Sequence, residues 1–198
     1  MRVSRAQAEA NRETVINVAS QLFREHGFDG IGLKDLMKGA GLTQGGFYKQ
    51  FESKDDLAAL ASRRAMENAA KRWSSAAAES ATPLESVFDI YLSEGHREEV
   101  ADGCPLIALG SDAARQSPEV RQSFQDGIAV YLRALEGFMP PSSGADAKTR
   151  AMAVLSLMAG AVTISRVLND DELSRAFLEV ARAEVSRIAT SEKPADDQ

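Results

Sequence analysis

Long stretches in which apolar residues recur every three or four positions are the feature that most constrains the fold of this chain. One such stretch contains Val15, Ile16, Ala19, Leu22 and Phe23. This spacing places the apolar side chains on one face of an α-helix. The 198 residues include only 6 prolines, and clusters of turn-forming residues are sparse. The sequence therefore predicts an all-α fold with enough residues to bury a core.

Glycine, serine, threonine and proline mark the expected ends of the helices. We expect helices over residues 8–26, 33–40, 44–50, 54–78, 83–92, 117–135, 147–168 and 171–189. Gly27 and Gly41 end the first two helices, because glycine readily adopts a left-handed conformation. Thr43 and Ser53 are good N-caps for the third and fourth. Thr82 and Glu85 form a capping-box pattern around a proline, and residues 190–198 are predicted to be a disordered tail.

The charge of the chain is unevenly distributed. The net charge of −6 alone argues against binding to nucleic acid. However, residues 1–55 carry 8 Lys and Arg against 7 Asp and Glu, whereas residues 56–198 carry 15 against 22. A near-neutral N-terminal part followed by an acidic remainder fits a chain that contacts phosphates locally while the rest stays away from DNA.

Several classes of protein do not fit this sequence. No apolar region typical of a signal peptide follows the first residues, and no run approaches eighteen apolar residues, so we expect a cytoplasmic protein without a membrane span. The single cysteine, Cys104, excludes an internal disulfide. We find no phosphate-binding loop and no metal-ligand spacing. His96 and Cys104 lack an evident third catalytic partner, so we predict no enzymatic activity, no cofactor and no metal site.

Residues 33–50 have the pattern of a helix-turn-helix, in which two short helices are joined by a tight turn. The second helix of such a motif enters the major groove of DNA. Gly45 and Gly46 each cost a short helix up to about 1 kcal/mol relative to alanine. Their presence is explained if the backbone must approach DNA closely. Gln44 and Tyr48 share an outward face, whereas Phe47 points into the core.

Residues 39–51 (GAGLTQGGFYKQF) and 53–57 (SKDDL) resemble the N-terminal domain of the TetR family of bacterial regulators, of the TetR/AcrR type. The resemblance extends over residues 12–60. It implies a dimeric repressor with an effector pocket in its C-terminal domain. The family's base and phosphate contacts would fall on Thr43, Gln44, Gly45, Tyr48, Lys49 and Lys54, with Gly46 allowing close approach. One departure is Gly32, which stands where the family often has a threonine whose hydroxyl meets a phosphate.

We therefore predict a three-helix DNA-binding domain over residues 1–55 and a helical effector-binding and dimerisation domain over residues 56–198. The protein would repress transcription from a palindromic double-stranded operator as a homodimer, until a small-molecule effector releases it. Apolar side chains on the predicted inner faces are candidates for the effector pocket, together with the cysteine: Phe88, Tyr91, Cys104, Phe124, Ile128 and Tyr131. Candidates for the dimer interface lie on the last two helices: Ala159, Gly160, Ala161 and Phe177.

Two other interpretations remain open. Cys104 lies between Gly103 and Pro105, where it is either a buried, inert thiol or a sensor for electrophiles and oxidants. A sensor thiol would make the chain a thiol-based repressor. A more distant alternative is a helical adaptor that binds only proteins, and salt-sensitive DNA binding would distinguish the regulator from the adaptor.

Overall fold

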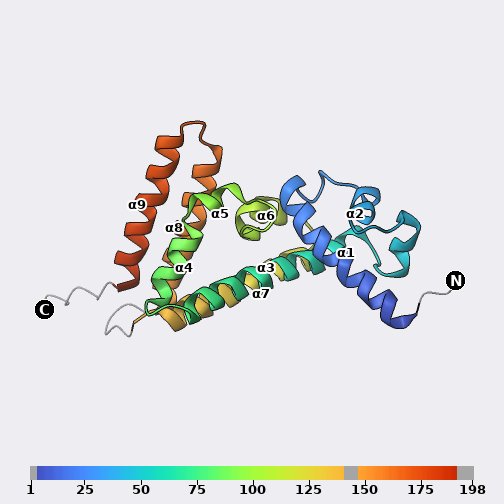
Figure 1. The fold of residues 1–198 in the computed structure, drawn as a ribbon, viewed down its shortest axis with the longest axis horizontal. Helices are drawn as coiled ribbons and strands as arrows, with labels where there is room; N and C mark the ends of the chain where they lie inside the picture. The colour runs from blue at the N-terminus through green and yellow to red at the C-terminus, as the bar shows by residue number, and fades with distance from the viewer. Residues whose placement is uncertain (1–3, 141–146, 191–198) are drawn as a thin grey trace, which may run out of the picture. The chain divides into compact units, whose positions relative to one another are not determined.

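The computed structural model describes residues 4–140 and 147–190. Within these residues all regular structure is helical, which confirms the predicted fold class (Figure 1). The elements are α1 (Arg5–His26), α2 (Leu33–Gly39), the 3-10 helix η1 (Gln44–Lys49), α3 (Lys54–Ala78), α4 (Pro83–Tyr91), α5 (Glu94–Glu98), α6 (Pro105–Ala113), α7 (Pro118–Phe138), α8 (Ala147–Val167) and α9 (Asp171–Thr190).

Most helix ends agree with the sequence pattern to within a few residues. Gly27 ends α1 with φ at 77°, and its N–H donates to the carbonyl of Phe23. The start of α1 was predicted three residues too late. Ser4 caps α1 by accepting a hydrogen bond from the backbone N–H of Gln7 at 3.1 Å. The short helix α5 was not predicted, because five residues are too few to show a helical period.

The predicted capping box at Thr82 and Glu85 is wrong, although Pro83 does begin α4. The hydroxyl of Thr82 makes no capping bond. It lies 3.4 Å from the hydroxyl of Ser80 instead. The carboxylate of Glu85 accepts from Arg182 at 2.6 Å and from Ser186 at 2.9 Å. Both partners of the expected box are therefore engaged elsewhere.

The first compact unit comprises residues 1–69 and 100–127. Its core includes Val15 and Phe23 of α1, Leu36 of α2 and Phe47 of η1, all 1% exposed or less. The rings of Phe23 and Phe28 lie 5.3 Å apart. The apolar stripe of α1 thus packs against α2, and α2 in turn packs against η1.

The second compact unit comprises residues 70–99 and 128–198. In it α8 and α9 lie side by side (Figure 1). Trp73 of α3 packs between two tyrosines, with ring centroids 4.6 Å from Tyr131 and 5.7 Å from Tyr91. All three rings are buried, and they form an aromatic centre for this unit.

These compact units are divided differently from the predicted functional domains. Packing joins residues 100–127 to the N-terminal helices, so the first unit extends well beyond residue 55. The division at residue 55 concerns function, and it stays a prediction. Of the predicted tail, Thr190 still belongs to α9, and residues 191–198 lie outside the described residues.

Candidate nucleic-acid interface

The turn between α2 and η1 is built by Gly41. Its φ of 69° lies in the left-handed region that favours glycine. The N–H of Gly41 donates to the carbonyl of Lys38, and the N–H of Leu42 donates to that of Met37, both at 2.9 Å. This pair of bonds is the Schellman motif, which satisfies the last carbonyls of a helix. The predicted end of the second helix at Gly41 is thereby confirmed.

The segment after the turn differs from the expected α-helix. Residues Gln44–Lys49 form a 3-10 helix, a form that proteins use in short pieces. Thr43 begins it with extended backbone, but its hydroxyl makes no capping bond, so the predicted side-chain cap is wrong. The N–H of Gly46 is already bonded to the backbone carbonyl of Thr43 at 3.0 Å, which leaves that hydroxyl free of this role.

The outward face of η1 carries exposed polar side chains. Gln44 and Lys49 are exposed, and Tyr48 is 72% exposed. Phe47 is fully buried and holds the Tyr48 ring edge-on, with centroids 5.1 Å apart. The segment therefore anchors itself by one aromatic ring and presents the other to solvent. Such an amphipathic ring with a hydroxyl tip can donate to a phosphate or to a base edge.

Nothing within the described residues requires glycine at the second and third positions of η1. Neither Gly45 nor Gly46 has a positive φ. A Cβ on Gly45 would have no neighbouring atom within 4 Å, and one on Gly46 would meet only the Cε of Met37 at 3.8 Å, an ordinary contact. A methyl group at either position would fit the fold. Packing and backbone conformation within the described residues therefore do not explain the two glycines.

The start of α3 completes this surface. The hydroxyl of Ser53 accepts from the N–H of Asp56 at 3.0 Å, which confirms Ser53 as the cap of the helix. The carboxylate of Asp56 in turn accepts from the N–H of Glu52 at 3.1 Å. Lys54, in the first turn of α3, is half-buried. A rigid helix start thus follows η1 directly.

Several supporting contacts were not predicted from the sequence. Arg64 of α3 bonds to Glu13 of α1 at 2.6 Å and to the side chain of Asn17. The guanidinium of Arg12 lies 5.3 Å from the ring centroid of Phe51, just after η1. These contacts join residues about 40 to 50 positions apart, a separation that a local pattern cannot indicate.

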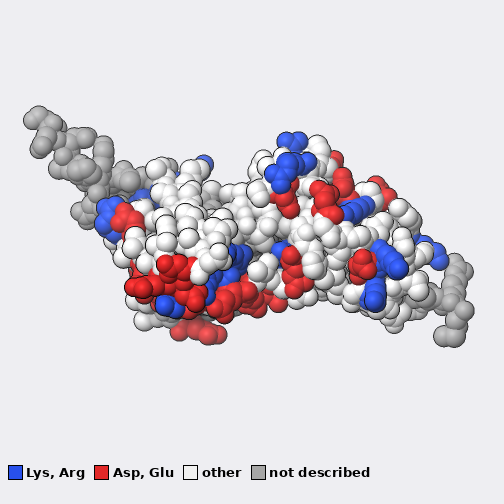
Figure 2. Space-filling view, turned by 90° about the horizontal axis from the view of Figure 1, so that it is seen from above, with Lys and Arg blue, Asp and Glu red and all other residues white. Residues whose placement is uncertain are grey.

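Charged side chains are unevenly distributed on the face that Figure 2 shows. In Figure 2 the Asp and Glu side chains gather over the helices of the second unit, whereas basic and acidic side chains alternate on the first. Within the described residues, no group of three or more His, Cys, Asp and Glu side chains is arranged to hold a metal ion.

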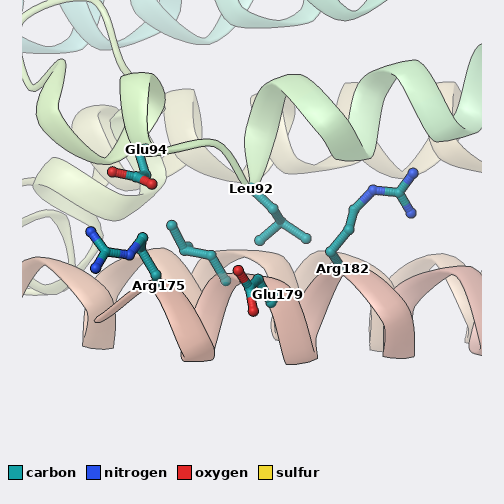
Figure 3. Close-up of a pocket in the computed structure, with 6 residues that line it drawn as sticks. Leu92, Glu94, Arg175, Glu179 and Arg182 are labelled. Carbon is teal, nitrogen blue, oxygen red and sulfur yellow. The ribbon is translucent and has the colours of Figure 1, made fainter. Parts of the chain in front are cut away.

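The six candidates for the effector pocket fall in different units. Phe88, Tyr91 and Tyr131 are buried in the second unit, where Ile128 is half-buried, and Cys104 and Phe124 are buried in the first. A pocket of about 210 Å³ lies in the second unit, and none of the candidates lines it. Its lining residues come from α9 and from the region of α4 and α5 (Figure 3): Leu92, Glu94, Arg175, Leu178, Glu179 and Arg182.

The candidates for the dimer interface lie on α8 and α9. Ala159 and Gly160 are half-buried and Phe177 is 37% exposed, whereas Ala161 is 4% exposed and packs within its own chain. Other large apolar side chains are exposed on the same two helices or at their ends: Met152, Ile164, Val167, Leu173 and Val180.

One helix in the described residues, Ala147–Val167, is long and apolar enough to cross a membrane by length and composition alone. Its apolar residues are interrupted by polar ones, as expected from the sequence, and the absence of a membrane span stays a prediction. The core helix of a soluble protein also meets these criteria, and 44% of the apolar window is buried here, so the finding is weak.

Comparison with known proteins bears on residues 15–61, which match the model of the bacterial regulatory proteins of the tetR family. Residues 15–61 thus match the N-terminal model of this family of regulators, and the rest of the chain lies outside the match. The HTH-type transcriptional regulator AcrR of Shigella flexneri is 34% identical over 56 residues, which cover 28% of this chain and 26% of AcrR. The aligned part thus spans about a quarter of that relative.

Two solved structures resemble the chain over most of its length. A TetR regulator from Chloroflexus aurantiacus shares 24% identity with a TM-score of 0.78, over 94% of this chain and 98% of the other. E. coli NemR in its reduced form shares 21% identity with a TM-score of 0.76, over 94% and 99%. At these identities the likeness shows the fold alone. The TetR match includes every residue that we predicted to contact DNA.

Proposed function

We propose that this TetR-family chain is a DNA-binding transcriptional repressor and not an enzyme, and that η1 is its recognition element. The observation that carries this proposal is the pairing of exposed Tyr48 and Lys49 with two glycines that the fold does not need. A backbone without side chains at Gly45 and Gly46 can approach the floor of the major groove.

Each candidate residue has a role in this proposal. Gln44 reads a base edge, and the hydroxyl of Tyr48 bonds to a phosphate or base. The ammonium of Lys49 and the half-buried stem of Lys54 place positive charge beside the DNA backbone. Thr43, exposed and without a capping bond, keeps its hydroxyl available for a phosphate.

A six-residue helix reads few bases, so we infer that two copies bind a palindromic operator together. The exposed apolar residues Leu173, Phe177 and Val180 on α9 favour an isologous dimer through α8 and α9. Gly160 has no atom within 4 Å of a Cβ position, which leaves room for a partner helix. Gly160→Glu should yield monomers in sedimentation, whereas a dimer that persists would place the interface elsewhere.

The remainder of the chain, residues 56–198, is proposed to bind a small-molecule effector that shifts the dimer to a state with weaker DNA binding. Its acidic character keeps this domain away from the duplex. We place the protein in the cytoplasm, where a repressor meets its operator. The apolar helix α8 then belongs to the dimer and not to a membrane.

The test is a selection of bound fragments from the source genome, followed by affinity measurements on the enriched site. Tyr48→Ala and Lys49→Ala should each weaken binding by about 1–3 kcal/mol without changing thermal stability. Affinity should fall steeply with salt. Wild-type affinity in both variants would show that η1 is not the recognition element. A protein that enriches no DNA would instead favour the helical adaptor.

A thiol-based repressor is the second candidate. E. coli NemR, whose solved structure is of its reduced form, shares the fold. Here Cys104 is 2% exposed and is the N-cap residue that precedes α6, next to the buried Gly103. Burial favours slow reaction of the thiol in the native state. N-ethylmaleimide should label Cys104 slowly unless the protein is denatured; fast native labelling that releases DNA, abolished by Cys104→Ser, would favour the sensor.

A further inference from the structure

The pocket drawn in Figure 3 lies entirely within the second unit, because every residue that lines it belongs to residues 70–99 or 128–198. Leu92 and Glu94 line it from the end of α4 and the start of α5, and the other lining residues lie on α9. Its volume of about 210 Å³ is below the roughly 300–1,000 Å³ of pockets for drug-sized ligands. The pocket therefore suits a smaller molecule.

The middle of the pocket is apolar. Leu92 and Leu178 are 7% and 3% exposed, and Leu92 lies between the charged groups of the two ends (Figure 3). Leu178 is about one helical turn from both Arg175 and Arg182, so these three residues share one face of α9. An apolar group of a ligand that covers the two leucines would be removed from water, which favours binding.

Arg182 lies at one end of the pocket, and its charge is already neutralised. Its guanidinium contacts the carboxylate of Asp89 at 2.5 Å and that of Glu85 at 2.6 Å. It also donates to the hydroxyl of Ser186 at 2.6 Å. Two carboxylates on one guanidinium leave no net positive charge for a ligand. The role of Arg182 is therefore to fasten α9 to α4.

The other end of the pocket carries charges that are not engaged. Arg175 and Glu179 lie four positions apart on α9, and Glu94 faces them from α5 (Figure 3). All three are exposed, and within the described residues none of them makes a hydrogen bond or an ion pair. Arginine before glutamate is the less favourable order for a pair four residues apart on a helix. Charges of both signs are thus available to a ligand.

The charges of this end match a ligand that itself carries both signs. The guanidinium of Arg175 can hold a carboxylate by two parallel N–H bonds. An ammonium group has three N–H donors, which the carboxylates of Glu94 and Glu179 can accept. A purely anionic ligand would place its charge beside two carboxylates, and a purely cationic one would place its charge beside Arg175. A zwitterion avoids both repulsions.

We propose that this pocket binds a small zwitterion of the amino-acid type, with its carboxylate on Arg175, its ammonium between Glu94 and Glu179, and an apolar side chain over Leu92 and Leu178. This inference rests on the proposed function only in that it names the chemical class of the effector. Binding itself uses one chain and no DNA.

The experiment titrates the full chain with matched probes and follows binding by nuclear magnetic resonance. L-phenylalanine and L-leucine carry all three features of the proposed ligand. 2-Phenylethylamine lacks the carboxylate, 3-phenylpropionate lacks the ammonium group, and glycine lacks the apolar side chain. L-phenylalanine or L-leucine should bind at least about tenfold more tightly than each of the three incomplete probes, because each of these loses one set of contacts. Saturable binding of neither amino acid would overturn the proposal, and so would tighter binding of an incomplete probe.

Two substitutions should weaken different probes. Arg175→Gln should weaken binding of the amino acid at least about tenfold but not that of 2-phenylethylamine, whose charge then loses a repulsive neighbour. Glu179→Gln should weaken binding of the amino acid and of 2-phenylethylamine but not that of 3-phenylpropionate. Equal weakening of every probe, or of none, would overturn the assigned contacts.

Matched controls lie on the same helix outside the pocket. Arg187→Gln removes an arginine whose ion pair with Glu184 stays within α9, and Glu172→Gln removes an exposed carboxylate of its first turn. Both should bind every probe like the wild type. Since Arg175 and Glu179 are exposed and unbonded, their variants should also keep the wild-type melting temperature.

Affinity for the selected operator, with and without saturating amino acid, separates this proposal from the proposed function. Zwitterion binding that leaves operator affinity unchanged would support the site and count against the effector part of the proposed function alone. A protein that binds its operator but neither amino acid would overturn the site alone.

Discussion

The helix-turn-helix and the C-terminal helices are held together by different kinds of contact. In the former, the bonds that shape the surface join near neighbours, such as the N–H of Leu42 to the carbonyl of Met37. In the latter, Arg182 reaches Asp89 at 2.5 Å across 93 positions, and Arg166 reaches His96 across 70. Local contacts leave a motif in the sequence, whereas distant pairs do not. The family match covers residues 15–61, which include this locally bonded motif.

Substitution of Arg150 should have the largest effect on the long-range contacts of the C-terminal helices. It is 3% exposed and donates to the carbonyls of Ala189 and Pro140. Ala189 is in the last turn of α9, where carbonyls lack partners within the helix. Arg150→Met should lower the free energy of unfolding by about 3 kcal/mol, since two carbonyls lose a buried donor. Urea unfolding measures it. Arg187→Met, on the exposed side of α9, serves as the control, and equal losses would contradict the argument.

In the helix-turn-helix, Gly46→Leu should weaken DNA binding without lowering the stability of the fold. The Cβ position has only an ordinary contact with Met37, and leucine has the higher helix propensity, so thermal stability should be kept or rise. Operator binding should weaken by at least about 2 kcal/mol, because the side chain blocks the approach of the backbone to DNA. A collapse of stability would instead show that the glycine is required for packing.

Gly41 and Gly45 form a matched pair within the same motif. Gly41→Ala should cost about 1 kcal/mol or more in the free energy of unfolding, because alanine is strained at a φ of 69°. Gly45→Ala should be neutral or stabilising, since its φ is negative and its Cβ position is open. Denaturant melts of the two variants decide it, and equal costs would contradict the conformational explanation.

The sequence could predict whatever depends on neighbours along the chain. Gly27 and Gly41 end helices and Ser53 caps one, as expected, because each needs only residues within five positions. The same reasoning wrongly predicted a capping box at Thr82, because the carboxylate of Glu85 is bonded to Arg182 of α9 instead. It also missed that η1 is a 3-10 helix, because six residues fit either helical period.

The position of the pocket was the least predictable feature. Phe88, Tyr91 and Tyr131 have the apolar spacing of pocket walls, but in the structure they form packed core. Periodicity identifies a buried face without telling whether a cavity lies behind it. The pocket beside Arg175 depends on which helices meet, and no local pattern carries that information.

His96 should make the second unit sensitive to acid. Burial lowers the pKa of this histidine below its ordinary value, while its bond to the carbonyl of Tyr91 partly opposes the shift and the charges of Arg166 and Arg72 add to it. Because the unfolded chain then binds a proton more readily than the folded one, stability should fall as pH drops below about 6.5. The loss should be modest, since the two largest causes oppose each other.

His96→Gln removes this titration, so its stability should change less than that of the wild type between pH 7 and the folded-state pKa of His96. Thermal melts across this range measure the difference. Parallel curves for the two proteins would show that other groups dominate the acid response.

The smallest expected effect concerns Gly32, the cap of α2, where the chain departs from the TetR pattern that it resembles. Its backbone is extended, with φ at −91° and ψ at 161°, and a Cβ would have its nearest atom, an oxygen of Asp35, at 4.0 Å. Threonine therefore fits, and its hydroxyl can accept from the N–H of Lys34 or Asp35. Gly32→Thr should raise the free energy of unfolding by a few tenths of a kcal/mol, about the difference between these two caps.

If α2 also faces a phosphate, the added hydroxyl should tighten operator binding by about 0.5–1 kcal/mol, the size of one hydrogen bond. Gly32→Ala is the matched control, because it adds the Cβ without the hydroxyl. Tighter binding by threonine but not by alanine would extend the proposed interface from η1 to the start of α2, whereas equal affinity in both variants would confine it to residues 43–54.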